Sequence, residues 1–184
     1  MGRPSVNGLM LHNQEEFMKR VIAIGGQGGS GKTAVGKALV LEIKPSAYVG
    51  ADALMTVNPF EVNEALEDLG LKNALAMISN FHGAGYDLVV LAGLIRNQRV
   101  LDELVSQLPP SVQFTFIWLR ASKQVRDQRR LRRSRDDADK VEWVDFVDRI
   151  TPDVPSFKLF RGHQMSIDTT DKTIIEVVKE IGAS

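Results

Sequence analysis

The chain has 184 residues, of which 43% are hydrophobic and 25% charged, and its 23 basic and 23 acidic side chains give a formal net charge of zero. This length and composition predict one soluble domain with its own core, and the neutral balance provides no overall field toward nucleic acid or membranes. The absence of cysteine excludes disulfides, thiolate metal sites and cysteine nucleophiles. The sequence contains no long apolar segment and no signal-like N-terminus, so we expect a cytoplasmic protein.

The beginning of the chain predicts a strand, a glycine loop and a helix. Residues 1–12 are rich in Gly, Pro, Ser and Asn, which favours a loose lead-in. The β-branched run Val21 to Ile24 predicts a buried strand, and Thr33 to Leu41 predicts a helix. Between them, Gly26 to Thr33 reads Gly-x-x-x-x-Gly-Lys-Thr, the P-loop pattern in the context that this motif requires. We therefore predict that the chain binds ATP with Mg²⁺.

The residues of this loop have separate mechanical roles in the prediction. Its glycines permit backbone angles that turn successive N–H groups toward a phosphate. Lys32 is expected to place its charge against the outer phosphates, and Thr33 to supply a hydroxyl ligand to Mg²⁺. The following helix directs its positive end at the same anion. The predicted nucleotide-binding residues are Gly26, Gly28, Gly29, Ser30, Gly31, Lys32 and Thr33.

The next segment places an acidic residue after a second strand. Ala47 to Val49 predicts a short strand that ends at Gly-Ala-Asp-Ala, which contains Asp52. This carboxylate is a candidate to orient or deprotonate a hydroxyl, or to hold Mg²⁺ directly or through water. The alternative interpretation is a turn or helix cap. Two helices are expected next, over residues 61–69 and 72–81, separated by Gly70.

The third predicted strand, Tyr86 to Ala92, is the most apolar in the chain. Nucleoside triphosphate motors and switches usually end such a strand in an acid that holds magnesium. Ala92 and Gly93 occupy that position here, which argues against a motor ATPase. A helix follows to about residue 108. Arg96 and Arg99 near its start are candidates to bind a polar or anionic acceptor, and the alternative is that they are ordinary helix-start charges.

The remaining chain predicts a strand at 112–119, a basic helix at 121–133, a charged loop at 134–140, a helix at 141–150, a strand at 163–167 and a helix at 171–181. We interpret about 126–150 as a lid. The alternative is that its arginines coat a solvated helix and pair with neighbouring acids. These interleaved acids, and the lack of aromatic residues in the basic run, argue against nucleic-acid binding.

Strands that alternate with helices predict a three-layer α/β/α sandwich with a five-stranded parallel sheet, in a single domain over 1–184. Ligands bind such sheets outside the carboxyl ends of the strands. The P-loop, Asp52, the loop at Gly93 and the basic helix all begin at those ends. We therefore expect one edge of the sheet to carry the site.

These motifs resemble the P-loop small-molecule kinases, a group that includes shikimate kinase, gluconate kinase, chloramphenicol phosphotransferase and the nucleoside monophosphate kinases. The resemblance covers about residues 21–182 and implies a P-loop NTPase fold of the nucleoside-kinase type. In this group an acid at the position of Asp52 contacts the acceptor hydroxyl or magnesium. An Arg-x-x-x-Arg pair at the base of the lid, matched by Arg129 and Arg133, is implied to hold the triphosphate and stabilise charge during transfer. The exit of the last strand, at 166–170, is implied to lie beside the adenine.

The expected function is ATP- and magnesium-dependent phosphoryl transfer to a hydroxyl of a small molecule, with Lys32, Asp52, Arg129 and Arg133 as catalytic residues. One alternative is a nucleotide or nucleic-acid-end kinase. Another is a nucleotide-binding regulatory protein that hydrolyses ATP slowly. The sequence leaves open the acceptor, the choice between ATP and GTP, and the oligomeric state.

Overall fold

The computed structural model describes residues 18–133, 146, 148–149, 151 and 156–182. The predicted lead-in and most of the predicted lid, including the greater part of the helix expected at 141–150, lie outside these residues. Within the described ranges, no helix has the length and apolar character needed to cross a membrane.

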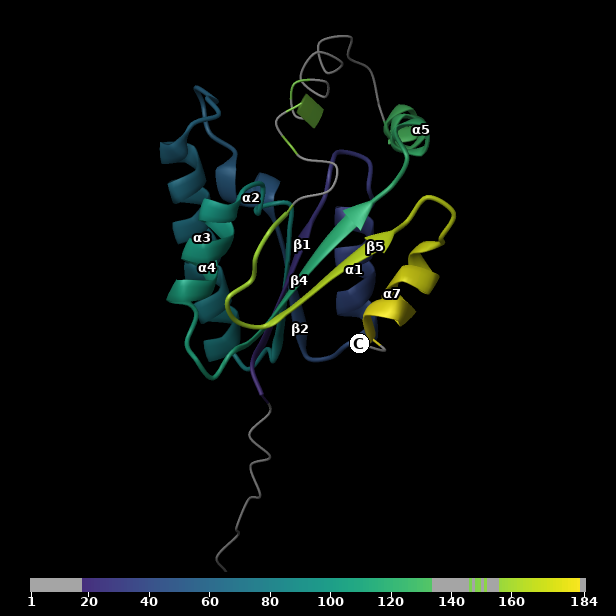
Figure 1. The fold of residues 1–184 in the computed structure, drawn as a ribbon. Helices are drawn as coiled ribbons and strands as arrows, with labels where there is room; N and C mark the ends of the chain where they lie inside the picture. The colour runs from purple at the N-terminus through teal and green to yellow at the C-terminus, as the bar shows by residue number, and fades with distance from the viewer. Residues whose placement is uncertain (1–17, 134–145, 147, 150, 152–155, 183–184) are drawn as a thin grey trace, which may run out of the picture.

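The centre of the molecule is a five-stranded parallel sheet with the strand order β2-β3-β1-β4-β5. Its strands are β1 (Arg20–Gly25), β2 (Ser46–Gly50), β3 (Leu88–Ala92), β4 (Gln113–Arg120) and β5 (His163–Asp168). The middle strand β1 pairs with β3, with Val21 opposite Val89, and with β4, with Val21 opposite Phe114. Because all strands run the same way, their carboxyl ends meet at one edge, the upper edge in Figure 1.

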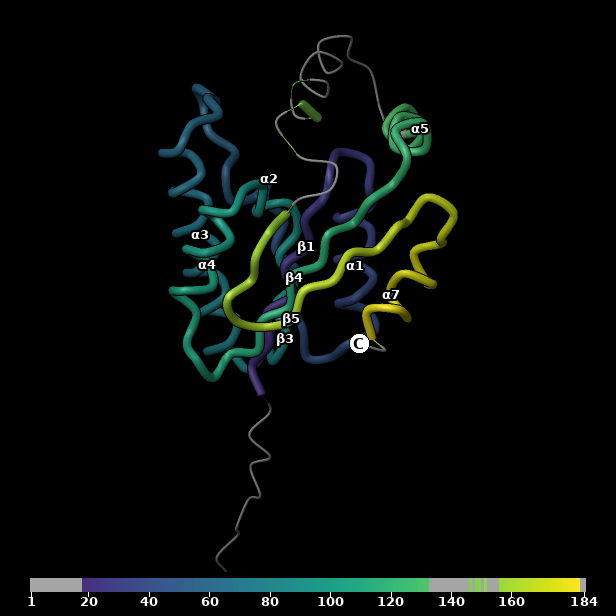
Figure 2. Tube along the Cα trace, viewed as in Figure 1, coloured from purple at the N-terminus to yellow at the C-terminus, as the bar shows by residue number. Residues whose placement is uncertain are grey.

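Helices cover both faces of the sheet, which confirms the predicted three layers. Figures 1 and 2 show α1 (Lys32–Glu42) and α7 (Ile174–Gly182) on one face, and α3 (Glu64–Gly83) and α4 (Gln98–Gln107) on the other. The short helix α2 (Ala51–Met55) follows β2 directly, and α5 (Lys123–Arg133) lies beyond the carboxyl end of β4.

The core is divided between the two faces by the alternation of side chains along each strand. In β1, Val21 and Ala23 pack in the cluster with α3 and α4, whereas Ile22 and Ile24 pack in the cluster with α1 and α7. Burial of such aliphatic side chains contributes about 1.5–3 kcal/mol each. This two-sided packing holds β1 rigidly at the centre, and with it the loop that leaves its carboxyl end.

The predicted break at Gly70 is wrong, because α3 runs without interruption from Glu64 to Gly83. Gly70 is buried inside this helix, and a Cβ there would lie 2.6 Å from the Sδ atom of Met55. The missing side chain therefore lets α2 pack closely against α3 instead of ending the helix. The helix begins at the cap residue Asn63, whose side chain accepts a 2.9 Å hydrogen bond from the Leu66 amide.

Candidate active site

The loop between β1 and α1 has the backbone of a phosphate-binding turn. Gly26, Gly29 and Gly31 have positive φ angles of 133°, 81° and 106°, a backbone conformation that residues with a side chain rarely adopt. A Cβ at Gly29 would lie 2.6 Å from the carbonyl oxygen of Arg126, so α5 packs directly on this turn. Glycine is thus required here both for the backbone conformation and for the close approach of α5.

Lys32 points into this loop. Its Nζ donates hydrogen bonds to the carbonyl oxygens of Gly26 (2.6 Å) and Gln27 (2.9 Å). Burial and, to a smaller extent, the neighbouring Arg96 lower the pKa of Lys32 to about 8, against smaller opposing effects of Asp148 and Asp52. The ammonium therefore lacks sufficient anionic compensation in the free protein, and a bound phosphate would supply it.

The loop lies between two cavities. A cleft of about 890 Å³ is lined by Gly26, Gly28, Lys32 and Thr33 of the loop, together with residues of α2 and of the segment between β3 and α4. A smaller cavity of about 420 Å³ is lined by Ser30 and Gly31 of the same loop, together with residues of α1, α5 and α7. A molecule on each side would therefore meet at the phosphate-binding turn.

The larger cleft brings together several of the predicted site residues. Asp52 lies in the first turn of α2 and is exposed in the cleft, which Thr33 and Arg96 also line. The position at which motor ATPases carry an acid is Gly93, whose amide donates a 2.9 Å hydrogen bond to the carbonyl of Ile24. A Cβ at Gly93 would lie 3.7 Å from Cε of Lys32, so the lysine side chain passes beside this glycine.

The donors in the cleft fit the predicted magnesium ion. Mg²⁺ keeps several waters and takes one or two protein oxygen ligands in addition to substrate phosphates. Thr33 and Asp52 supply such hard oxygens, and both are solvent-exposed, which leaves space for waters. In the described part of the chain, no three His, Cys, Asp or Glu residues gather as a metal site, so an ion here would depend on the phosphates for most of its ligands.

The structure places Arg99 away from this cleft. Its guanidinium donates to Glu67 (2.7 Å), Asp68 (2.7 Å) and Glu103 (3.1 Å), so its charge is neutralised where α3 meets α4. Arg99 is not among the residues that line the cleft, whereas Arg96 is. The structure therefore does not bring Arg99 together with Asp52.

Arg129 lies beside the smaller cavity. Its guanidinium donates to the hydroxyl (3.0 Å) and the carbonyl (2.6 Å) of Thr169 at the exit of β5. The Thr169 hydroxyl in turn donates to the carbonyl oxygen of Ser30 in the P-loop, at 3.0 Å. Arg129 thus contacts the loop through one residue. Arg133 is the last residue of α5, and its side chain lies outside the described part of the structure.

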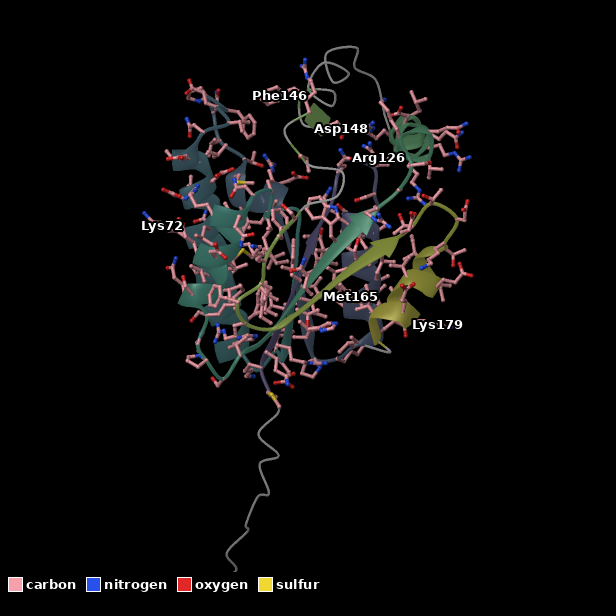
Figure 3. All side chains as sticks on the ribbon, viewed as in Figure 1. Lys72, Arg126, Phe146, Asp148, Met165 and Lys179 are labelled. Carbon is pink, nitrogen blue, oxygen red and sulfur yellow. The ribbon has the colours of Figure 1, made fainter. Side chains whose placement is uncertain are left out.

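A second pair of α5 arginines, which the sequence analysis did not single out, lies against the loop. Arg126 and Arg130 both donate to the same Oδ2 atom of Asp148, at 2.6 and 3.1 Å, and Figure 3 shows Arg126 and Asp148 beyond the carboxyl ends of the strands. Arg126 also donates to the carbonyl of Gly28 at 3.3 Å. The side chains of Arg126, Asp148 and Arg130 are only 6%, 12% and 17% exposed, so this is a largely buried ion-pair cluster.

Gln27 joins the same segment to the P-loop. Its side-chain amide donates to the carbonyl oxygens of Thr151 (3.0 Å) and Asp148 (3.4 Å). Residues 148 and 151 are therefore attached to the loop by the side chain of Gln27, and Asp148 is also joined to it through Arg126, which contacts Gly28.

Neither a protein-family model nor a curated protein matches the chain, but solved structures do. A gluconokinase from Sinorhizobium meliloti 1021 is 18% identical with a TM-score of 0.65, over 91% of each chain. A sugar kinase from Janibacter sp. HTCC2649 is 14% identical with a TM-score of 0.67, over 90% of this chain and 93% of that one. The fold is that of the P-loop small-molecule kinases. Kti12 from Chaetomium thermophilum, in complex with ADP-AlF3, is also similar (14% identity, TM-score 0.58, 89% of this chain and 97% of that one).

Removal of Asp148 should destabilise the protein much more than removal of an exposed acid. Asp148→Ala leaves the buried guanidinium of Arg126 without its carboxylate and leaves Arg130 with Asp127 alone, for which we expect a loss of about 3 kcal/mol in the free energy of unfolding. Asp68→Ala, the matched control, breaks a half-exposed pair with Arg99 and should cost less than about 1 kcal/mol. Urea unfolding of both variants gives the comparison, and equal losses would contradict the buried cluster.

The pKa of Lys32 predicts proton uptake on nucleotide binding. Between about pH 8 and the ordinary pKa of 10.5, Lys32 is protonated in the unfolded chain but has lost its proton in the folded protein without nucleotide. The contribution of Lys32 therefore makes the nucleotide-free protein more stable as pH rises through this window. A bound phosphate restores the charged form, so nucleotide affinity should fall across this window. Calorimetry of ATP binding without magnesium, near pH 8.5 in two buffers of different ionisation enthalpy, should show proton uptake that Lys32→Met removes and Lys179→Met retains. Uptake in Lys32→Met equal to that of the wild type would contradict the assignment.

Proposed function

We propose that the protein is a kinase that transfers the γ-phosphoryl group of ATP, with Mg²⁺, to a hydroxyl of a small molecule. The observation that carries this proposal is the position of the P-loop between two cavities. Phosphoryl transfer needs the attacking and leaving oxygens in line on opposite sides of the phosphorus. A nucleoside in one cavity and an acceptor in the other would meet that requirement.

The donor occupies the smaller cavity and the loop. The base and ribose lie beside Arg129 and Thr169 in the 420 Å³ cavity, and the phosphates cross the loop from Gly26 to Thr33. Lys32, which lacks an anionic partner of comparable strength in the free protein, binds the outer phosphates and neutralises charge as the phosphoryl group moves. Kti12, which has a similar fold, was solved with ADP-AlF3. The reaction needs ATP, for which the cytoplasm is the natural location.

The acceptor occupies the larger cleft, with its hydroxyl at Asp52. The hydroxyl oxygen forms a bond to the γ-phosphorus while the bond from that phosphorus to the β,γ-bridging oxygen breaks, and ADP leaves. The hydroxyl proton passes to the Asp52 carboxylate, which also orients the attacking oxygen. Thr33 and Asp52 would hold Mg²⁺, whose charge neutralises the phosphates. Arg96 binds a polar or anionic part of the acceptor.

Arginines of α5 stabilise the charge that spreads over the transferred group, a task that suits the planar guanidinium. Arg129 reaches the loop through Thr169, whereas Arg126 and Arg130 pair with Asp148 and hold α5 against Gly28. Arg133, the partner of Arg129 in the predicted lid pair, is one turn further along the same helix. We assign Arg129 and Arg133 to the closing of the site over the triphosphate.

A nucleotide-binding regulatory protein is the second candidate. The similarity to Kti12 and the connection of residues 148 and 151 to the loop through Gln27 support it, because that segment would report which nucleotide is bound. Slow hydrolysis would then reset the state. This candidate needs no acceptor in the larger cleft.

Asp52→Asn separates the two candidates. For a kinase, we expect acceptor-dependent ADP release to fall by about 100-fold or more, because the base and one magnesium ligand are lost, while ATP affinity without magnesium stays nearly unchanged. The assay uses a panel of small alcohols, nucleosides and an oligonucleotide with a free 5′-hydroxyl. Asp68→Asn, which lies outside the cleft, is the matched control and should retain activity.

The other outcomes are equally informative. Slow ADP release that depends neither on the acceptor nor on Asp52 would support the regulatory protein instead. Transfer only to nucleosides, nucleotides or the oligonucleotide would support a nucleotide or nucleic-acid-end kinase. An absence of ATP binding would contradict both candidates.

A further inference from the structure

The larger cleft has an uneven distribution of charge. Three cations line it, Lys32, Lys37 and Arg96, whereas Asp52 is the single carboxylate among its described lining residues. Lys32 serves the donor phosphates, and Lys37 lies over the ring of Tyr48, 5.9 Å from its centroid. Arg96 is therefore the cation that remains for a ligand on the acceptor side.

Arg96 differs from its neighbour Arg99 in its surroundings. Arg99 makes ion pairs with three acids, whereas within the described ranges no hydrogen bond or ion pair engages the Arg96 guanidinium. Its side chain lines the same cleft as that of Lys32. Two cations in one partly buried cleft repel each other, and an anion bound between or beside them would offset this repulsion.

Another part of the cleft lining is apolar. Val57 and Phe60, in the segment between α2 and α3, line the cleft while 37% and 46% exposed. The lining also includes Met77 and the buried side chain of Ile95. A ligand with an apolar body would cover this surface and gain from removing it from water.

The cleft is poorly equipped for a molecule with many hydroxyls. Apart from Asp52, its described lining contains no carboxylate, and it contains no asparagine, glutamine or histidine side chain. Its side-chain hydroxyls are those of Thr33, Tyr48, Thr56 and Thr151, and that of Thr56 already donates to the Asp52 carbonyl at 2.5 Å. A polyol would leave several of its donors and acceptors unpaired on burial, and each unpaired group lowers affinity.

We propose that the acceptor is an amphipathic anion, with one reactive hydroxyl at Asp52, an acidic group at Arg96 and an apolar body against Val57 and Phe60. This inference rests on the proposed function, since it names the substrate class of that site. It distinguishes the protein from a kinase of polyhydroxylated sugar acids, although a gluconokinase is among the similar folds.

Three six-carbon probes isolate the features of this proposal. 6-Hydroxyhexanoate has a terminal hydroxyl, an apolar chain and a carboxylate. D-Gluconate is the same chain with four further hydroxyls, and 1,6-hexanediol replaces the carboxylate by a neutral group. Their Kd values are measured by ligand-observed NMR with ADP and magnesium present, so that the nucleotide fills the P-loop and carboxylates do not compete for it. We expect 6-hydroxyhexanoate to bind at least about fivefold more tightly than either of the others.

Paired variants test the two contacts. Arg96→Gln should lower the affinity for 6-hydroxyhexanoate to that for 1,6-hexanediol and leave the affinity for the diol unchanged. Lys179→Gln, which removes a cation on α7 far from the cleft (Figure 3), should change neither affinity. Phe60→Ala should reduce the preference over D-gluconate, whereas Phe160→Ala, at an exposed position outside the cleft, should not.

The outcomes separate this inference from the proposed function. The expected binding order with its dependence on Arg96 and Phe60 supports the inference, even if no probe is phosphorylated. Tighter or equal binding of D-gluconate overturns it, even if D-gluconate is phosphorylated and the kinase function is thereby established. Failure of all three probes to bind, or an unchanged preference in Arg96→Gln, overturns it as well.

Discussion

The turn from β1 into α1 is the constraint on which the rest of the structure depends. It has to reverse the chain with positive φ angles at Gly26, Gly29 and Gly31, and it has to leave space for the backbone of Arg126 at Gly29. A side chain at Gly29 would strain the turn and push α5 away from it. The same bare backbone therefore forms the proposed phosphate site, holds α5 and its arginines beside it, and lies between the two cavities.

The distribution of charge around this turn indicates which groups serve stability and which serve a ligand. A buried charge is costly unless it is paired, and Arg126 and Arg130 share Asp148, while Arg99 is surrounded by acids on the surface of α3 and α4. Among the described residues, Lys32 donates hydrogen bonds only to carbonyl oxygens in the loop, and its burial without an anionic partner of comparable strength lowers its pKa. Lys32 and Arg96, which line the same cleft, are thus suited to anions that the protein does not itself provide.

The sequence correctly predicted those structural elements that depend on residues close together in the chain. The strand, glycine loop and helix around Lys32 follow from residue types within a few positions, and parallel strands necessarily bring Asp52 to the same edge as the loop. The prediction at Gly70 failed because this glycine makes room for Met55 of α2 in the folded protein. The pattern of apolar residues along the sequence contains no information about such a long-range contact.

Long-range partners account for the features that the sequence analysis did not assign. Asp148 is 22 residues from Arg126, and the acids around Arg99 include Glu67 and Asp68 on another helix, so no local spacing connects them. The spacing of Arg126 and Arg130, four residues apart on one face of α5, was a visible signal, but four other arginines lie nearby in the same run. Burial, which the structure supplies, is what distinguishes this pair.

The most direct test of the account is a crystal structure with a non-hydrolysable ATP analogue and magnesium. The account predicts the base in the 420 Å³ cavity beside Arg129 and Thr169, the phosphates on the loop with Lys32, and the γ-phosphate open to the 890 Å³ cleft at Asp52. A base that occupies the larger cleft would leave no place for an acceptor at Asp52. That result would contradict the assignment of the two cavities and the transfer reaction derived from it.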